Sequence, residues 1–206
     1  MTRGHLREIE KATVKLTKKR GQGVLVKGNC ILTAAHCITY SGNGEMALGD
    51  YFTEDIQTQR GAFKASPLAV EPVSDIAVLG AVDGQATEEF FQEWCRFEDF
   101  CEKTKPVELC PAKYYKPGQS FKIWILTHTG EWVIGKATSP RVGAHLVFVE
   151  AEKSIKGGTS GGPIVNELGQ LVGLVSTFGG TGGHSRSGPS PCPSLTLPVW
   201  ILHLIA

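Results

Sequence analysis

The sequence has no long hydrophobic run and no excess of charge of either sign. No apolar run in the 206 residues approaches the roughly 20 that a membrane-spanning helix requires, so no membrane partner is expected. Basic and acidic residues nearly balance, 21 against 20, which argues against a nucleic-acid surface. The one basic cluster, at 18–20, is better interpreted as a solvated hairpin end than as a binding patch.

The sequence also lacks a paired-cysteine motif, an internal repeat and an apolar core near its first residues. Residues 1–5 therefore do not resemble a secretory signal, and reduced thiols are expected rather than disulfides. Because no CxxC pair is present, neither a metal site nor a cofactor is expected. The six cysteines lie at positions 30, 37, 95, 101, 110 and 192.

What the chain does contain is many short β-type runs separated by Gly, Pro, Asn and Asp, which indicates an all-β barrel or sandwich. A helix is expected over 87–103, with its aromatic side chains in the core, and a second over 199–206. Residues 179–193 form a Gly-, Ser- and Pro-rich loop. The expected strands are 12–16, 23–26, 30–33, 76–79, 121–126, 131–136, 146–150, 162–165 and 171–176.

Three local motifs carry chemically useful residues. His36 ends an apolar run in the sequence TAAHC, and Asp75 opens an apolar strand in SDIAVL. Ser160 lies in the glycine-rich turn GTSGGP. Asp50 and Asp55 are weaker acid candidates than Asp75, because no apolar strand follows them.

Together these residue types suit nucleophilic catalysis. A serine hydroxyl needs an adjacent base, and a histidine of ordinary pKa near 6.5 can accept its proton. A buried carboxylate holds the imidazole in the right tautomer and stabilises its charged form. Glycines allow a sharp turn whose N–H groups converge on one point and can bind an oxyanion.

The three motifs, in the order His, Asp, Ser, resemble those of the chymotrypsin-like (trypsin-like) serine protease superfamily. The resemblance implies two six-stranded antiparallel barrels, an inter-barrel helical insertion and a C-terminal helix. It divides a single protease domain, 1–206, into a first barrel (1–84), a connecting segment (85–110), a second barrel (111–198) and a closing helix (199–206). It also implies a serine endopeptidase acting on protein or peptide substrates, with His36, Asp75 and Ser160 catalytic and the N–H groups of Gly158 and Ser160 forming the oxyanion hole.

Two departures from trypsin refine the resemblance. Thr159 occupies the position of the aspartate that pairs with a newly freed N-terminus in zymogen-type members, so activation by that salt bridge is not expected. In this respect the chain resembles bacterial Deg-type and viral chymotrypsin-like proteases. Cys30 lies too near Cys37 in sequence to match the partner in trypsin's histidine-loop disulfide.

The resemblance also predicts a substrate pocket. Ser154 stands where trypsin has its pocket-floor aspartate, so a preference for Lys or Arg is not expected. Ile155 suits a medium apolar side chain, whereas the flanking lysines 153 and 156 either favour acidic substrates or are solvated. The far walls are expected at Ser176, Thr177 and Phe178.

A second functional hypothesis is a catalytically silent fold kept as a protein-binding module, because the missing aspartate leaves open what orders the turn before Ser160. His128 and His145 are expected to have surface or structural roles. The expected location is cytoplasmic, or the host-cell cytoplasm for a viral protein, and any regulatory partner is unknown.

Overall fold

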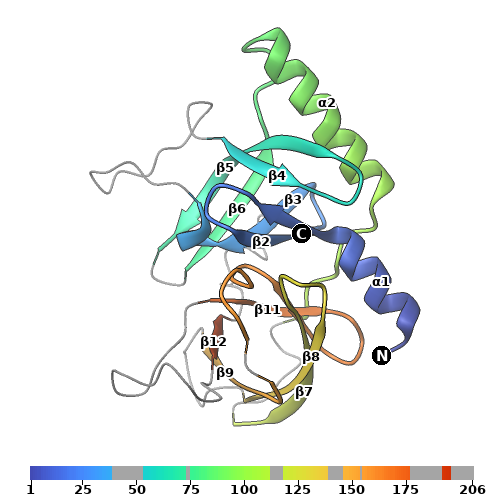
Figure 1. The fold of residues 1–206 in the computed structure, drawn as a ribbon, viewed down its shortest axis with the longest axis vertical. Coiled ribbons are helices and arrows are strands. Elements are labelled where there is room, and N and C mark those ends of the chain that lie inside the picture. Colours follow the sequence, from blue (N-terminus) through green and yellow to red (C-terminus); the bar gives the residue numbers. More distant parts are fainter. Residues whose placement is uncertain are drawn as a thin grey trace.

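The structure is a computed structural model that describes residues 1–38, 53–72, 75–111, 118–138, 146–153, 155–176 and 192–195. For 146–150 and 192–195 it describes the backbone alone. The strands form two sheets, one above the other in Figure 1, with one helix above the upper sheet and another beside the two.

The first sheet closes into a barrel of six antiparallel strands in the order β1-β2-β3-β6-β5-β4. Leu16 pairs with Ile56 where β1 meets β4 and closes the ring. Strands β2 and β3 are buried at every residue, because α1 contacts β2 and β11 of the second sheet contacts β3. The strands are β1 (Thr13–Leu16), β2 (Gly21–Val26), β3 (Cys30–Ala34), β4 (Glu54–Gln57), β5 (Ala62–Glu71) and β6 (Ile76–Ala81).

The second sheet has the strand order β10-β11-β12-β9-β8-β7, and Ile164 of β10 pairs with Ile125 of β7 to close it. The prediction of a mostly β fold built on six-stranded antiparallel sheets is confirmed. The closing helix expected over 199–206 lies outside the described residues. The strands are β7 (Ser120–Leu126), β8 (Trp132–Thr138), β9 (Leu146–Ala151), β10 (Pro163–Val165), β11 (Leu171–Val175) and β12 (Cys192–Leu195).

The predicted inter-barrel helix is present as α2 (Glu88–Lys103), and the Thr87 hydroxyl caps it by accepting from the Phe90 N–H. Its buried face differs from the prediction. Phe97 is buried against β5, but Phe91 and Trp94 are 48% and 39% exposed and stack on each other. The prediction that all the aromatic residues are core is therefore wrong, because the face toward β5 runs through positions 93, 97, 100 and 101.

A second helix, α1 (Arg3–Ala12), was not expected, and it precedes β1 directly. The Thr2 hydroxyl accepts from the His5 N–H at its start, and only Ile9 and Ala12 are buried. Its apolar residues lie on one face, but they are too few for the segment to stand out in the sequence as a packed helix. Neither described helix is long and apolar enough to span a membrane.

Three strands were also missed. β4 carries two acids in four residues. β5 contains Pro67, and its register with β6 shifts between Pro67 and Ala69. Proline and charged residues are depleted in strands, so pattern alone argues against both. Cys192 and Pro193, assigned to the 179–193 loop, instead begin β12, where pairing to β9 overrides their local preference.

Candidate active site

His36 and Asp75 meet because strands β3 and β6 pair in antiparallel register. Ala34 lies opposite Ile76 at the end of this pairing, so the residues just after β3 face the residue just before β6. The Ala35 N–H donates to the Asp75 carbonyl oxygen at 3.0 Å. His36 follows in the short 3₁₀ turn η1 (Ala35–Cys37), which projects its side chain beside Asp75.

The Asp75 carboxylate accepts three hydrogen bonds. Oδ1 accepts from the His36 backbone N–H at 2.9 Å, and Oδ2 lies 2.8 Å from His36 Nδ1. An ionised carboxylate can only accept, so Nδ1 carries the proton and Nε2 is left facing away from Asp75. The Ser176 hydroxyl also donates to Oδ2. Asp75 has φ 54°, a left-handed conformation that aspartate tolerates better than most side chains.

This contact shifts both pKa values in the directions expected of an ion pair. The hydrogen bond to Asp75, followed by one to the Cys37 side chain, raises the pKa of His36 to about 10, against partial desolvation. Burial alone would raise the pKa of Asp75, but the hydrogen bonds from His36 and Ser176 together hold it below its usual value. Both shifts favour the charged forms of the pair, imidazolium and carboxylate.

Ser160 lies in a turn tied to both sheets. Its carbonyl oxygen accepts from the Gln22 N–H of β2 at 2.7 Å, and the Gly161 N–H donates to Val175 of β11 at 2.6 Å. Gly161 has φ +78°, and a Cβ there would lie 2.0 Å from the Gln22 carbonyl oxygen. Only glycine fits this position, which explains the residue that follows the serine.

The serine turn and the histidine turn flank the same residue of β2. A Cβ on Gly21 would lie 2.5 Å from Cys37 Sγ and 3.3 Å from the Ser160 carbonyl oxygen. The structure thus brings the Ser160 turn next to the segment that carries His36 and Asp75. In the described part of the chain, no hydrogen bond joins the Ser160 hydroxyl to the His36 imidazole.

The N–H groups predicted to form an oxyanion hole belong to Gly158 and Ser160. Among the described residues, neither the Gly158 N–H nor the Ser160 N–H donates a hydrogen bond. Gly158 has φ +90°, as in the third position of a type II turn. Both N–H groups are therefore available to a ligand oxygen.

Comparison with known proteins identifies the family and the fold. The family model described as a trypsin-like peptidase domain matches residues 21–174, most of the chain. The chain belongs to the trypsin-like peptidase family. This membership implies protein substrates for the domain.

Two solved structures share the fold of this trypsin-like peptidase. One is the inactive form of a serine-to-alanine mutant of Rv3671c from M. tuberculosis H37Rv, at 17% identity and TM-score 0.57, covering 98% of this chain and 89% of that chain. The other is the Rv3671c protease in its inactive form, at 16% identity and TM-score 0.58, covering 98% and 93%. A search of curated protein sequences gives no significant match.

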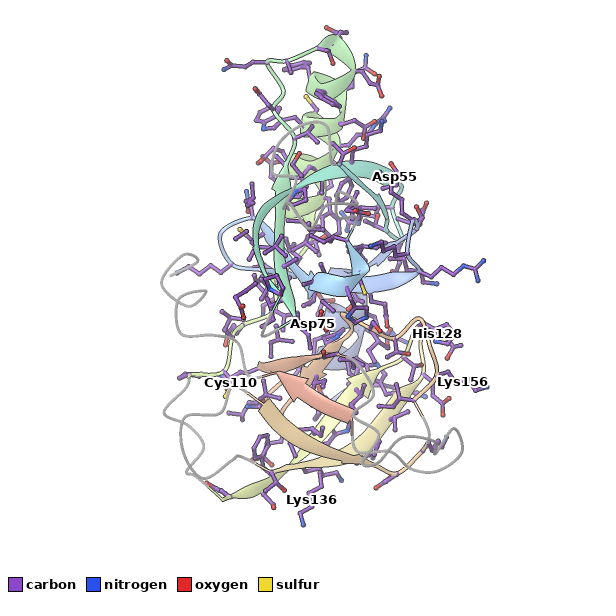
Figure 2. The ribbon with its side chains drawn as sticks, turned by 90° about the vertical axis from the view of Figure 1, so that its left-hand side faces the viewer. Asp55, Asp75, Cys110, His128, Lys136 and Lys156 are labelled. Carbon is purple, nitrogen blue, oxygen red and sulfur yellow. The ribbon has the colours of Figure 1, made fainter. Side chains whose placement is uncertain are left out.

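Thr159, at the position of the zymogen-type aspartate, has a partner of a different kind in this peptidase. Its side chain is 1% exposed, and Oγ1 accepts from the His128 backbone N–H at 3.3 Å. The same Oγ1 lies 3.3 Å from His128 Nδ1. The structural role predicted for His128 thus gains a definite partner, one that sequence spacing did not indicate. Figure 2 labels Asp75 and His128 at the level where the two sheets meet.

Cys37 forms no disulfide. Gly21 lies against its Sγ, since a Cβ on Gly21 would be 2.5 Å from that atom. Among the described cysteines, Cys30, Cys37, Cys95 and Cys101 are free thiols. The described residues also contain no group of His, Cys, Asp or Glu that could hold a metal ion.

The predicted substrate pocket is only partly described. Ser154, Thr177 and Phe178 lie outside the described residues. Ile155 is 4% exposed and belongs to the apolar cluster inside the second sheet, and Ser176 directs its hydroxyl at Asp75. Lys153 forms an ion pair with Glu131, which favours a solvated role over substrate recognition. The pocket walls stay a prediction.

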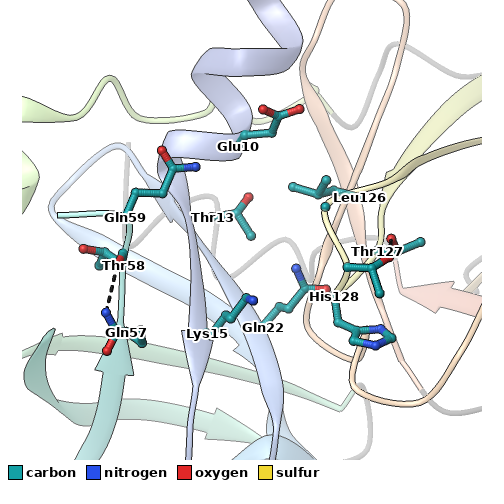
Figure 3. A pocket seen from close by; sticks show the side chains of 12 residues that line it. Glu10, Thr13, Lys15, Gln22, Gln57, Thr58, Gln59, Leu126, Thr127 and His128 are labelled. Carbon is teal, nitrogen blue, oxygen red and sulfur yellow. Dashed lines mark hydrogen bonds between the residues drawn. The ribbon is translucent and has the colours of Figure 1, made fainter. Parts of the chain in front are cut away.

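A cavity of about 320 Å³ lies between the two sheets, close to the turn of Ser160. His128 lines it from the β7–β8 loop, Gln22 from β2, and Glu10 from α1 (Figure 3). Gln22 is 3% exposed, and its Oε1 has no hydrogen-bond partner among the described residues. The cavity therefore lies next to two of the residues that hold the serine turn.

Proposed function

We propose that this chain is a serine endopeptidase that cleaves peptide bonds through an acyl-enzyme, with His36, Asp75 and Ser160 as its triad. The observation that carries the proposal is the double contact between His36 and Asp75, 2.9 Å at the backbone and 2.8 Å at Nδ1, beside the turn of Ser160. This contact leaves Nε2 as the only ring nitrogen able to accept a proton.

In this mechanism the neutral His36 Nε2 takes the proton of the Ser160 hydroxyl as its oxygen attacks the substrate carbonyl carbon. The carbonyl π electrons move to oxygen, and the N–H groups of Gly158 and Ser160 stabilise that oxyanion. The C–N bond of the intermediate then breaks, His36 gives its proton to the leaving amine, and the acyl group stays on Ser160 as an ester. Water, deprotonated by the same Nε2, attacks the ester carbon; the C–O bond to Ser160 breaks, the acid product leaves, and His36 returns the proton to the Ser160 oxygen.

Asp75 acts by orientation and charge. Its carboxylate keeps the proton on Nδ1 and stabilises the imidazolium that forms when Ser160 loses its proton. The free N–H groups of Gly158 and Ser160 support the proposed oxyanion hole, because donors already engaged elsewhere could not serve it. The missing hydrogen bond between Ser160 and His36 does not exclude the mechanism, since such contacts often tighten only with substrate.

The direct test is covalent labelling with a fluorophosphonate, which reacts with an activated serine. We expect labelling of the wild type and none of Ser160→Ala, with strong losses in His36→Ala and Asp75→Asn. Folded wild-type protein that stays unlabelled across pH 6–10 would contradict the proposal. Peptide-library cleavage would then identify the side chain preferred before the cleaved bond.

The second candidate, a catalytically silent binding module, is favoured by one observation: the Ser160 hydroxyl is not bonded to His36 in the described structure. The labelling experiment separates the two candidates. A folded protein that binds a polypeptide but neither reacts nor cleaves it would support the silent module.

We also propose that the protein works in the cytoplasm. The Cys37 thiol, with Gly21 in place of a disulfide partner, supports a reducing compartment. Cell fractionation with an antibody to the chain tests this, and recovery from an oxidising compartment would contradict it.

A further inference from the structure

The turn that carries the proposed oxyanion hole is built almost wholly of glycine. Gly157, Gly158, Gly161 and Gly162 surround two residues with side chains, Thr159 and Ser160. Glycine loses the most backbone freedom on ordering, so such a turn needs external contacts to hold one conformation. Ser160 and Gly161 are held by backbone bonds to β2 and β11, but those contacts lie on the far side of Thr159 from Gly158.

Thr159 follows Gly158 in the chain, and its side chain is held by His128. It is 1% exposed, and both the backbone N–H and Nδ1 of His128 lie 3.3 Å from its Oγ1. The imidazole also lies against Gly158, since a Cβ there would be 3.4 Å from His128 Cγ. His128 thus contacts two consecutive residues of the turn.

The loop that presents His128 is itself held in place. The Thr127 hydroxyl accepts from the Glu131 N–H at 3.1 Å, and the Thr127 N–H donates to the Glu131 carbonyl oxygen at 2.9 Å. These bonds close the β7–β8 hairpin around His128. The ring therefore projects from a closed hairpin of the second sheet.

We propose that His128 is a positioning residue for the hydrolysis proposed above: through Thr159 it holds the Gly158 N–H in the orientation that binds the oxyanion. The Thr159 hydroxyl accepts from the His128 backbone N–H and hydrogen-bonds Nδ1, while the ring packs against Gly158. In zymogen-type relatives, an aspartate at the position of Thr159 pairs with a newly freed N-terminus, and here the contact of His128 with Thr159 takes the place of that ion pair. The inference rests on the proposed function and assigns a role that the triad does not include.

The test uses the concentration dependence of fluorophosphonate labelling, which separates the limiting rate from the apparent affinity. Loss of a hydrogen bond of ordinary strength corresponds to a roughly two- to thirteenfold change in an equilibrium. We expect His128→Ala to lower the limiting rate about tenfold, with the apparent affinity unchanged. Thr159→Val loses both bonds and lowers the rate further, whereas Thr159→Ser keeps the hydroxyl and stays near wild type.

The double variant provides the sharpest result. If His128 acts through the threonine hydroxyl, Thr159→Val combined with His128→Ala falls to about the same rate as Thr159→Val alone, since coupled residues are non-additive. Thr129→Val is the matched control, because it removes a hydroxyl from the same loop that bonds Thr127 and not the turn. It should label at the wild-type rate. His128→Asn, which retains a polar atom near the Nδ1 position, should recover part of the lost rate.

The failures of the two proposals can be told apart. Unlabelled, folded wild type overturns the proposed function and this inference with it. A wild type that labels while His128→Ala and Thr159→Val label equally fast overturns the inference alone. The inference alone is also overturned if His128→Ala and Thr159→Val lower the apparent affinity and leave the limiting rate unchanged. The same holds if Thr129→Val lowers the limiting rate as much as they do. Circular dichroism shows which variants are folded, and should His128→Ala be unfolded, His128→Asn and the Thr159 pair decide the result.

Discussion

At the residue scale, the site depends on a carboxylate that accepts from three donors and a histidine whose pKa it raises. Asp75 is partly buried in a left-handed conformation, and the bonds from Ala35, His36 and Ser176 hold it there. These contacts favour the charged pair, so in the proposed mechanism His36 must lose a proton before Ser160 can react.

The pH dependence of activity should reflect that deprotonation. The hydrogen bond to Asp75 raises the pKa of His36 to about 10, so the neutral base is populated only as pH rises above 6.5 toward that value. We expect kcat/KM to increase through the alkaline range, with the midpoint of the increase well above pH 6.5, the ordinary pKa of histidine. Asp75→Asn should move this midpoint to lower pH and should also reduce the maximal kcat/KM. A wild-type midpoint at or below pH 6.5 would show that the pair does not persist in solution.

Stability should depend on pH in the opposite sense. His36 has a raised pKa in the folded state, so its stabilising contribution is complete below about 6.5 and is lost as pH rises toward 10. Asp75 has a lowered pKa, so its contribution is present above about 3.9 and is lost under more acidic conditions. The midpoint of urea unfolding should therefore fall on the alkaline side where activity rises. His36→Ala should flatten that fall, and an unchanged pH dependence in this variant would contradict the assignment.

Ser176 offers a test of the third bond to Asp75. Ser176→Ala removes a donor to a partly buried carboxylate, and hydrogen bonds to charged groups contribute about 1.5–3 kcal/mol. We expect kcat to fall roughly tenfold or more, with little change in KM. Ser66→Ala is the matched control, since Ser66 is equally buried and its hydroxyl has no partner among the described residues. Equal kcat values for the two variants would show that Ser176 does not act on Asp75.

At the scale of elements, α2 is attached to the first barrel by one face only. Phe63 of β5 lies between Phe97 and Phe100, with ring centroids 5.5 and 5.4 Å away. Glu93, 8% exposed, accepts from the Lys64 backbone N–H at 2.8 Å and pairs with Arg96 at 2.6 Å. The polar contact fixes Glu93 of α2 to the backbone of β5, and the aromatic contacts supply most of the apolar burial.

Glu93→Ala should therefore destabilise the protein. It removes the acceptor of a strand N–H and leaves that donor partly buried, which costs about 1–3 kcal/mol. Glu102→Ala, at an exposed position of the same helix, should change the free energy of unfolding by less than about 0.5 kcal/mol. Urea denaturation measures both. Equal values for the two variants would show that Glu93 does not anchor α2.

At the scale of the whole molecule, one apolar cluster joins the first barrel, α1 and part of the second sheet, which also has a cluster of its own. Val165, Leu171 and Leu174 of the second sheet cluster with the first barrel, and Ile9 of α1 joins them. The Trp132 Nε1–H of β8 donates to Glu10 Oε1 at 2.7 Å, a link between residues 122 positions apart. In Figure 1, α1 runs beside both sheets, as this link requires.

This link predicts a small, specific loss of stability. Glu10→Ala removes the acceptor of the indole N–H and should lower the free energy of unfolding by about 1 kcal/mol. Glu10→Gln keeps an oxygen acceptor and should lose less. Thermal unfolding distinguishes the two, and a wild-type value for Glu10→Ala would show that the bond contributes nothing.

How much the sequence predicts differs from element to element. His36, Asp75 and the Ser160 turn were found from local motifs, because each motif combines a reactive side chain with the strand or glycine turn that presents it. The contacts of Ser176 with Asp75 and of His128 with Thr159 were not, because these residues are 101 and 31 positions apart and carry no motif. β4 and β5 were missed because pairing stabilises them against their own composition, and α1 because it buries only two residues.

The sequence by itself determined the kind of protein: short strands between turn residues, and a His, an Asp and a Ser in glycine-punctuated motifs. Those signals are local, so they survive without knowledge of the partners. Only the tertiary structure decided which groups donate to the Asp75 carboxylate, that Gly21 lies against Cys37, and that His128 hydrogen-bonds Thr159. These contacts join different strands and loops, and their register depends on the pairing and packing of the whole chain.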